Sequence, residues 1–266
     1  MRRVSLLLSL ALVTAACGHA SKQVTTTPPA PSAATTTTSV AQPPPTATAV
    51  ESEPAQTTSL RVYFLRDGKV APVARAVPVT QAVAAAALRA LVAGPTENGL
   101  STAIPPGTRA PVPTVADGVA TVDFPGGLSH AAVAQIVYTL TQFPTVRSVR
   151  ATRSLDGTKL TRADFEDVTP AILVESPLPG ERIESPLRVR GTANTFEATF
   201  VLELRNSSDR TLSRETVTAT SGSGTRGTFD TTISFGAGGP AWLVAYEPSA
   251  ENGKPLRTVR IPLVTG

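Results

Sequence analysis

Few side chains in this 266-residue chain could carry out chemistry. It has one cysteine, Cys17, and two histidines, His19 and His130. A single cysteine excludes an internal disulfide and any multi-cysteine zinc or iron–sulfur site. Nucleophilic catalysis needs a nucleophile beside a positioned base, and His130 adjoins Ser129 at an expected helix start, where capping is the commoner role. We therefore expect no catalytic residue, no metal site and no cofactor, and a hydrolase is the least favoured hypothesis.

Charged residues give no strong signal of a ligand either. The acidic cluster of Asp164, Glu166 and Asp167 could offer oxygen ligands to a hard cation, but it lacks the EF-hand spacing, and a solvated linker is the preferred interpretation. No phosphate loop, dinucleotide fingerprint or H-E-x-x-H pattern is present. The net charge is only +4, and the three arginines within 147–153 form no dense patch. We predict no nucleic-acid partner.

Cys17 ends an N-terminal leader. The arginines at 2–3 form a positive region, and residues 4–16 form an apolar core of signal-peptide length, shorter than the ~20 residues that span a bilayer. Residues 15–18 (AACG) resemble a bacterial lipobox, although Thr14 stands where that family prefers leucine. The resemblance implies that Cys17 takes a diacylglyceryl group and becomes the new N-terminus. The alternative is an ordinary secretory signal that releases a soluble protein.

The segment that follows has a different composition. Residues 1–17 are predicted to be the signal peptide, and residues 18–59 are rich in Thr, Pro, Ala and Ser with almost no large apolar side chain. Such a segment cannot bury enough surface to offset its conformational entropy, so we predict a disordered linker. At ~3.1 Å per residue it could extend on the order of 100 Å. The predicted location is the extracytoplasmic face of the cell membrane, lipid-anchored.

Residues 60–160 are predicted to form an α+β domain. Alternation and turn residues indicate strands at 60–65, 73–77, 110–115, 119–124 and 146–151. Helical spacing indicates helices at 80–93 and 129–142, with Thr80 and Ser129 as N-caps. An Asp-Gly pair at 117–118 predicts a hairpin turn. The order of elements predicts two helices packed on one face of a small sheet.

Sequence blocks in this domain carry a family resemblance. They lie at 88–96 (LRALVAGPT), 99–108 (GLSTAIPPGT), 116–124 (ADGVATVDF) and 135–143 (QIVYTLTQF). In this order they resemble the GerMN domain of bacterial sporulation and spore-germination lipoproteins. The resemblance implies an α/β domain of envelope proteins without a known catalytic residue. Turns and helix ends explain most of the blocks, but some polar residues in them are candidates for a binding surface: Thr102, Thr108, Gln135 and Thr139.

From residue 171 onward the pattern consists of strands only. Residues 171–264 are predicted to form an all-β immunoglobulin-like sandwich, with strands at 171–175, 187–190, 196–205, 211–218, 227–234, 241–247 and 258–264. The strand at 196–205 is expected to point five side chains into the core: Phe196, Ala198, Phe200, Leu202 and Leu204. Another is expected to add core bulk through Trp242, Val244 and Tyr246. Pro262 argues for a sheet edge in the last strand.

Short blocks in this second region carry another resemblance. They are 176–180 (SPLPG), 185–187 (SPL), 191–193 (GTA) and 196–198 (FEA), and they resemble the immunoglobulin-like domain of bacterial spore-germination proteins, which often follows a GerMN domain. We therefore predict a non-enzymatic membrane-anchored protein whose two domains mediate protein–protein interaction or self-association in the cell envelope. A peptidoglycan- or carbohydrate-binding module is the alternative, suggested by the envelope location and the polar helix face.

Overall fold

The computed structural model describes residues 56–266 except 125, 153–156 and 237. All the described residues belong to one compact unit of the chain. The predicted leader, Cys17 and the linker up to residue 55 lie outside the described residues. None of the described helices is long and apolar enough to cross a membrane.

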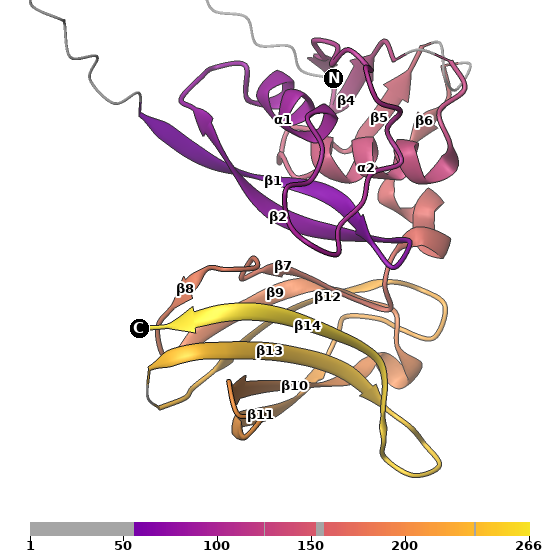
Figure 1. Ribbon diagram of the computed structural model, residues 1–266. Helices are drawn as coiled ribbons and strands as arrows, with labels where there is room; N and C mark the ends of the chain where they lie inside the picture. Colours follow the sequence, from indigo (N-terminus) through magenta and orange to yellow (C-terminus); the bar gives the residue numbers. More distant parts are fainter. Residues whose placement is uncertain (1–55, 125, 153–156, 237) are drawn as a thin grey trace, which may run out of the picture. The chain divides into compact units, whose positions relative to one another are not determined.

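The first domain begins with a β-hairpin. Strands β1 (Thr57–Arg66) and β2 (Lys69–Pro78) pair antiparallel along their full lengths. The turn between them has positive φ at Asp67 and Gly68, which matches the twist of a two-residue hairpin. Because β1 starts at Thr57, the domain begins earlier than the predicted linker boundary at residue 59. The hairpin forms a sheet of its own (Figure 1).

Two helices follow and pack against each other and against β1. They are α1 (Val83–Val92) and α2 (His130–Leu140), the second ending two residues before its predicted end at 142. Ser129 is the N-cap of α2, as predicted, and its hydroxyl accepts a hydrogen bond from the Ala132 amide at 3.2 Å. The prediction of Thr80 as a cap is wrong. The N-cap of α1 is Ala82, and the Thr80 hydroxyl accepts from the Ala82 amide in the preceding turn.

The remaining strands of this domain form a second sheet. They are β3 (Thr114–Ala116), β4 (Val119–Val122), β5 (Ser148–Ala151) and β6 (Lys159–Leu160), in the order β3-β4-β5-β6. The hairpin between β3 and β4 turns at Asp117-Gly118, as predicted. Strands β4 and β5 are parallel because α2 makes the crossover between them. The α+β class is confirmed, but its strands divide between two sheets instead of one.

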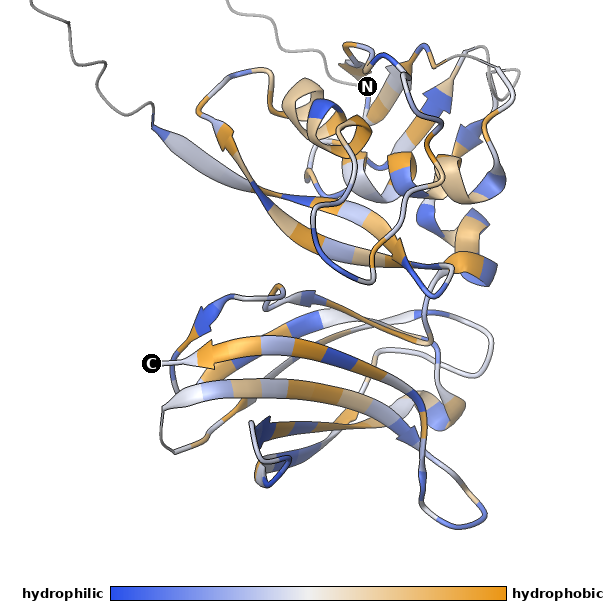
Figure 2. Cartoon of the chain, in the orientation of Figure 1, coloured by the Kyte–Doolittle hydropathy of each residue, from blue (hydrophilic) through white to orange (hydrophobic). Residues whose placement is uncertain are grey.

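The second domain is a β-sandwich, as predicted. Its strands are β7 (Ile172–Ser176), β8 (Arg182–Ile183), β9 (Leu187–Ala193), β10 (Thr199–Asn206), β11 (Thr211–Thr218), β12 (Gly227–Ile233), β13 (Gly239–Pro248) and β14 (Pro255–Thr265). They form the sheets β11-β10-β13-β14-β8 and β12-β9-β7 (Figure 1). Figure 2 shows hydrophobic and hydrophilic residues alternating along β14, as expected for a strand with one face in the core. The sequence did not predict β8.

The predicted start of the strand at 196–205 is wrong. Phe196 is 62% exposed, and it opens a short 3₁₀ helix, η2 (Phe196–Ala198), in which Glu197 and Ala198 have positive φ. The strand begins only at Thr199. The later residues of the predicted inward stripe are buried in the sandwich core, as predicted: Phe200, Leu202 and Leu204.

The prediction that β13 adds core bulk through Trp242, Val244 and Tyr246 is confirmed only in part, because Val244 and Tyr246 are buried in a small cluster separate from the sandwich core. The sandwich core takes from this strand Ala241, Leu243 and Ala245. The predicted core residues lie on the other face, where they pack with Val201: Trp242, Val244 and Tyr246. The smaller residues fit the space between two sheets. Trp242 instead stacks with the Arg260 guanidinium, 5.2 Å from its ring centroid, at the surface.

Candidate functional site

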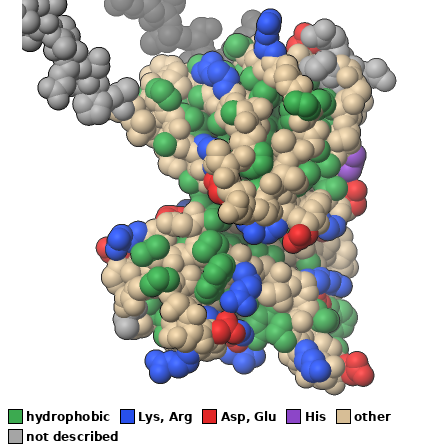
Figure 3. All heavy atoms as spheres, in the orientation of Figure 1, with side chains coloured by type: hydrophobic (Ala, Val, Ile, Leu, Met, Phe, Trp, Pro, Cys, Tyr) green, Lys and Arg blue, Asp and Glu red, His purple; other side chains and the backbone are tan. Residues whose placement is uncertain are grey.

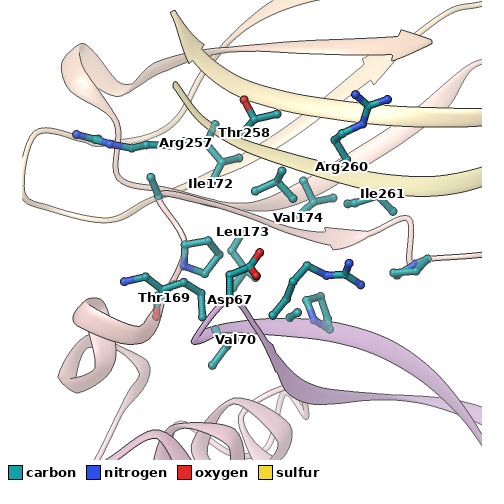
Figure 4. A pocket seen from close by; sticks show the side chains of 18 of the residues that line it. Asp67, Val70, Thr169, Ile172, Leu173, Val174, Arg257, Thr258, Arg260 and Ile261 are labelled. Carbon is teal, nitrogen blue, oxygen red and sulfur yellow. The ribbon is translucent and has the colours of Figure 1, made fainter. Parts of the chain in front are cut away.

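A cleft of about 620 Å³ lies between β2 of the first domain and the strands β7 and β14 of the β-sandwich (Figure 4). Its walls are largely apolar and include Val70, Val73, Leu173, Val174, Val259 and Ile261. Its lining also contains charged residues from both domains. A large, mainly apolar concavity with a few polar groups is the usual form of a binding site.

Strand β7 fixes one wall of the cleft because both of its faces are buried. Ile172 and Val174 point into the core of the β-sandwich, whereas Leu173 belongs to the core of the first domain. This division follows from the two-residue period of a strand, which sends successive side chains to opposite faces. A single strand therefore contributes to two hydrophobic cores.

The next residue on the first-domain face of β7, Glu175, is the centre of a polar cluster. Arg162 donates to its carboxylate at 2.7 Å, and the Tyr63 hydroxyl donates to the same oxygen. Arg61 donates to the Glu175 carbonyl at 3.1 Å. The Arg162 guanidinium also lies 4.7 Å from the centroid of the Tyr138 ring. Charge, hydrogen bonds and a cation–π contact thus meet at one buried position.

Burial and pairing act in opposite directions on the Glu175 carboxyl. Burial by itself raises its pKa. The charge of Arg162 and the hydrogen bonds from Tyr63 and Arg162 lower it by more, so that the pKa of Glu175 lies below its ordinary value. Burial also raises the pKa of the Tyr63 hydroxyl, which keeps it protonated as the donor. In this cluster Glu175 is therefore an ionised carboxylate paired with Arg162, and Tyr63 is a neutral phenol. Both groups keep their ordinary charge at neutral pH.

The predicted solvated linker is instead a short 3₁₀ helix, η1 (Arg162–Val168), with specific partners. Glu166 accepts from Arg226 at 2.8 Å and from the Asn194 side chain at 2.8 Å. Asp167 pairs with His130 at 2.9 Å, and Asp164 accepts from the Thr161 amide in a capping box. No cluster of possible metal ligands occurs in the part of the chain that the structure describes.

The charged residues of the cleft have a positive balance. Its lining holds four cationic residues and two carboxylates, a net charge of +2: Arg66, Lys69, Arg257, Arg260, Asp67 and Glu166. Arg257 pairs with Glu247 at 2.8 Å, and Arg260 with Asp209 at 3.1 Å. In Figure 4 both arginines extend away from the hairpin that carries Asp67 and Val70. Lys69 donates to the Asp167 carbonyl. Among the described residues, no carboxylate lies within ion-pair distance of Arg66.

Comparison with known families matches both domains. Residues 61–161 match the family model described as sporulation and spore germination, and residues 171–254 match that of the immunoglobulin-like domain of bacterial spore germination. The chain is a GerMN-type domain followed by a germination-type immunoglobulin-like domain. No curated protein matches the chain.

Among solved structures, the chain is similar to the tandem GerMN domains of the sporulation protein GerM from Bacillus subtilis. The identity is 17% and the TM-score 0.35, and the match covers 67% of this chain and 62% of that chain. The match therefore spans less than two thirds of the length of that structure. At this identity and score the likeness says nothing about function.

The polar residues predicted to line a binding surface of the GerMN domain do not form one. Gln135 and Thr139 are fully buried. Gln135 accepts from the Ala103 amide at 2.8 Å and donates to the Tyr63 carbonyl at 3.0 Å, and the Thr139 hydroxyl accepts from the Tyr63 amide at 3.1 Å. These two side chains satisfy backbone groups of β1 that no strand pairs, so the prediction is wrong for both.

The other two candidates have local roles. Thr102 donates to the Gln135 side chain at 3.3 Å and accepts from the Ile104 amide, so it extends the same internal network. Thr108 donates to the Pro105 carbonyl at 2.6 Å within a turn. The helix face that the sequence suggested for binding is thus directed at β1 of the GerMN domain.

Sequence reasoning missed the cleft, although one signal was available. The segment at 172–174 (ILV) has no polar residue in alternation, which is the pattern of a strand buried on both faces. In a sandwich with one solvated face, such a run predicts a second covering layer. The GerMN domain supplies that layer, and the cleft opens beside it.

Proposed function

We propose that this protein is a non-enzymatic lipoprotein, anchored through Cys17 to the extracytoplasmic face of the cell membrane, that binds a protein partner through its two domains. The observation that carries the proposal is the cleft lined by both domains. Its walls are apolar, and Arg66 lies in its lining without a carboxylate partner among the described residues. The families of the two domains support an interaction role, and the sequence at 15–18 supports the anchor.

The surface of the immunoglobulin-like domain also supports a binding role. In the space-filling view, hydrophobic side chains adjoin Lys and Arg side chains on this domain (Figure 3). Trp242 and Arg260 stack on the outer face of its larger sheet, where Arg260 is exposed. Aromatic residues and arginine are enriched at protein interfaces. The partner would be another envelope protein or a second copy of this chain.

The peptidoglycan alternative loses its main support in the GerMN domain, because Gln135 and Thr139 are buried. The hydrolase hypothesis has little support as well. The Ser129 hydroxyl accepts from a helix amide, and His130 pairs with Asp167, so the two neighbours do not act on each other.

Two linked measurements test the proposal. Membrane fractionation of cells that produce the intact chain or the Cys17→Ser variant tests the anchor. We expect the intact chain in the membrane fraction and the variant outside it; equal membrane retention of the variant would refute lipid anchoring.

Chemical crosslinking followed by pull-down from those membranes tests the binding role. Ala71 lines the cleft, so Ala71→Trp fills part of it, whereas Ala250→Trp adds the same bulk at an exposed position outside the lining. We expect a crosslinked partner that Ala71→Trp loses and Ala250→Trp keeps. Recovery of monomer alone from all three proteins would contradict the proposed function.

A further inference from the structure

The cleft is lined by the edges of strands, not by their faces. Strand β14 contributes the consecutive residues 257–261, and β7 the consecutive residues 172–174. A strand that turned one face to a cavity would contribute only alternate residues. Consecutive residues show that the backbone itself borders the cleft.

The edge of β14 is open along the cleft. On one side β14 pairs with β13, with a bulge that leaves Arg257 and Thr258 without a registered partner. On the other side β8 pairs only with Val264 and Thr265, and Gly180 donates to the Pro262 carbonyl. No described strand pairs with that side of β14 between Pro255 and Ile261.

The direction of the free backbone groups follows from the neighbouring hydrogen bonds. The Pro262 carbonyl and the Val264 amide are bonded on the side away from β13, at 2.8 and 3.0 Å. Residues two apart in a strand direct their backbone groups to the same side. The amide and carbonyl of Arg260 therefore also point away from β13, toward the open edge.

Of the strand edges in the cleft, that of β14 is the accessible one. Thr258 and Arg260 are exposed, whereas Ile172, Leu173 and Val174 of β7 are at most 2% exposed. The lining of β2 includes Pro72, which has no amide hydrogen to donate. An extended chain entering the cleft would thus find its hydrogen-bonding partners on β14 and an apolar wall on β2.

We propose that the cleft binds an extended, acidic peptide segment of a partner protein, which adds as a strand to the free edge of β14. Backbone hydrogen bonds to β14 supply the pairing, and alternate side chains of the peptide meet the apolar wall. The net charge of +2 in the lining, with Arg66 free of a carboxylate partner among the described residues, favours a peptide with a carboxylate. This inference rests on the proposed function and names the chemistry of the partner.

The test uses the purified full chain and a fluorescent synthetic peptide of sequence Thr-Val-Asp-Val-Thr-Val, with binding measured by fluorescence anisotropy. Arg260→Pro removes the amide that points to the free edge. The strand already carries a proline at the same parity, Pro262, so its pairing with β13 is kept. Arg260→Ala is the matched control, because it removes the same side chain and retains the amide.

We expect Arg260→Pro to weaken binding about tenfold relative to Arg260→Ala, the effect of losing one backbone hydrogen bond. Replacing Asp by Lys in the peptide should weaken binding by a similar factor at low salt. Equal affinities of the two variants would overturn the proposal, and so would the absence of measurable binding of the acidic peptide.

Two modified peptides keep the test independent of the fold of Arg260→Pro. One is N-methylated on its valine amides and the other on the Thr and Asp amides, so each lacks the donors of one edge. Strand addition predicts that one of the two loses binding and the other keeps it; equal binding by both would overturn it. The two proposals can fail separately. If the acidic peptide does not bind but the membrane pull-down still recovers a partner that Ala71→Trp loses, strand addition is refuted and the proposed function is kept.

Discussion

Glu175 accepts hydrogen bonds from three side chains on two separated segments of sequence, β1 and η1. Its partners are Tyr63 on β1, Arg162 on η1 and, through its backbone carbonyl, Arg61. Only 14% of its side chain is exposed, and 24% of that of Arg162. A buried pair of this kind adds little net stability compared with apolar residues of the same shape, but removing one partner leaves the other charge unpaired.

Glu175→Gln is therefore expected to lower the free energy of unfolding by about 2–3 kcal/mol. This loss is somewhat smaller than that for breaking a fully buried pair, because both side chains are partly exposed to water. Urea unfolding monitored by tyrosine fluorescence measures it. The matched control is Glu215→Gln, an exposed glutamate on β11, which should change stability by less than ~0.5 kcal/mol. Equal effects of the two substitutions would show that the cluster does not contribute as described.

Glu97 provides a pH-dependent contribution that can be assigned to one contact. Arg75 donates to both of its oxygens, at 2.5 and 2.7 Å, and these hydrogen bonds lower the pKa of Glu97 from 4.5 to about 2. A carboxyl with a lowered folded-state pKa stabilises the fold above its unfolded pKa, and this contribution is lost as the pH falls from 4.5 toward 2.

NMR titration of the Glu97 carboxyl carbon tests this assignment. The midpoint should be about 2 in the native protein, and Arg75→Gln should return it toward 4.5. The size of the stabilisation is small because the Glu97 side chain is 39% exposed. A midpoint that stayed unchanged in Arg75→Gln would remove Arg75 as the cause.

At the scale of elements, the two helix starts differ in how they are capped. The Ser129 side chain satisfies an amide of the first turn of α2, whereas Ala82 offers α1 no side-chain acceptor. Ser129→Ala should therefore cost about 1 kcal/mol of stability, and Thr80→Ala clearly less, because Thr80 lies before the helix. Thermal unfolding followed by circular dichroism compares the two; a larger loss for Thr80→Ala would reverse the assignment of the cap.

The sequence predicted the elements better than their surroundings. Local patterns, such as Asp117-Gly118 and the Ser129 cap, depend on a few neighbouring residues, and both were confirmed. The sequence did not predict which face of β13 enters the sandwich core, because alternation defines two faces without saying which one the second sheet covers. The size of Trp242 suggests a position in the sandwich core. It lies instead on the other face of β13, where it contacts Arg260 and packs against the cluster of Val201, Val244 and Tyr246.

The candidate site was harder to predict because its residues meet only through tertiary structure. Gln135 and Thr139 look like surface residues on a helix, but a separate hairpin, β1–β2, needs their polar atoms for its backbone. The cleft joins β2, β7 and β14, whose residues are about 85 to 190 positions apart in the chain. Nothing local relates Val70 to Ile261.

At the scale of the whole molecule, β7 links the two domains. It follows η1 directly, places Leu173 in the GerMN core and keeps Ile172 and Val174 in the immunoglobulin-like core. A binding site at such a junction can require both domains at once, which would explain why they occur in one chain. The proposed anchor at Cys17 would present that site outside the membrane.

The most direct measurement is site-specific photo-crosslinking in living cells. A photo-crosslinking amino acid replaces Thr258, in the cleft, or Ser208, at an exposed turn outside its lining, in the chain that retains Cys17. If the cleft is the binding site, a discrete crosslinked protein forms from position 258 in the membrane fraction and not from position 208. Crosslinks of equal yield at both positions, or none at position 258, would contradict it.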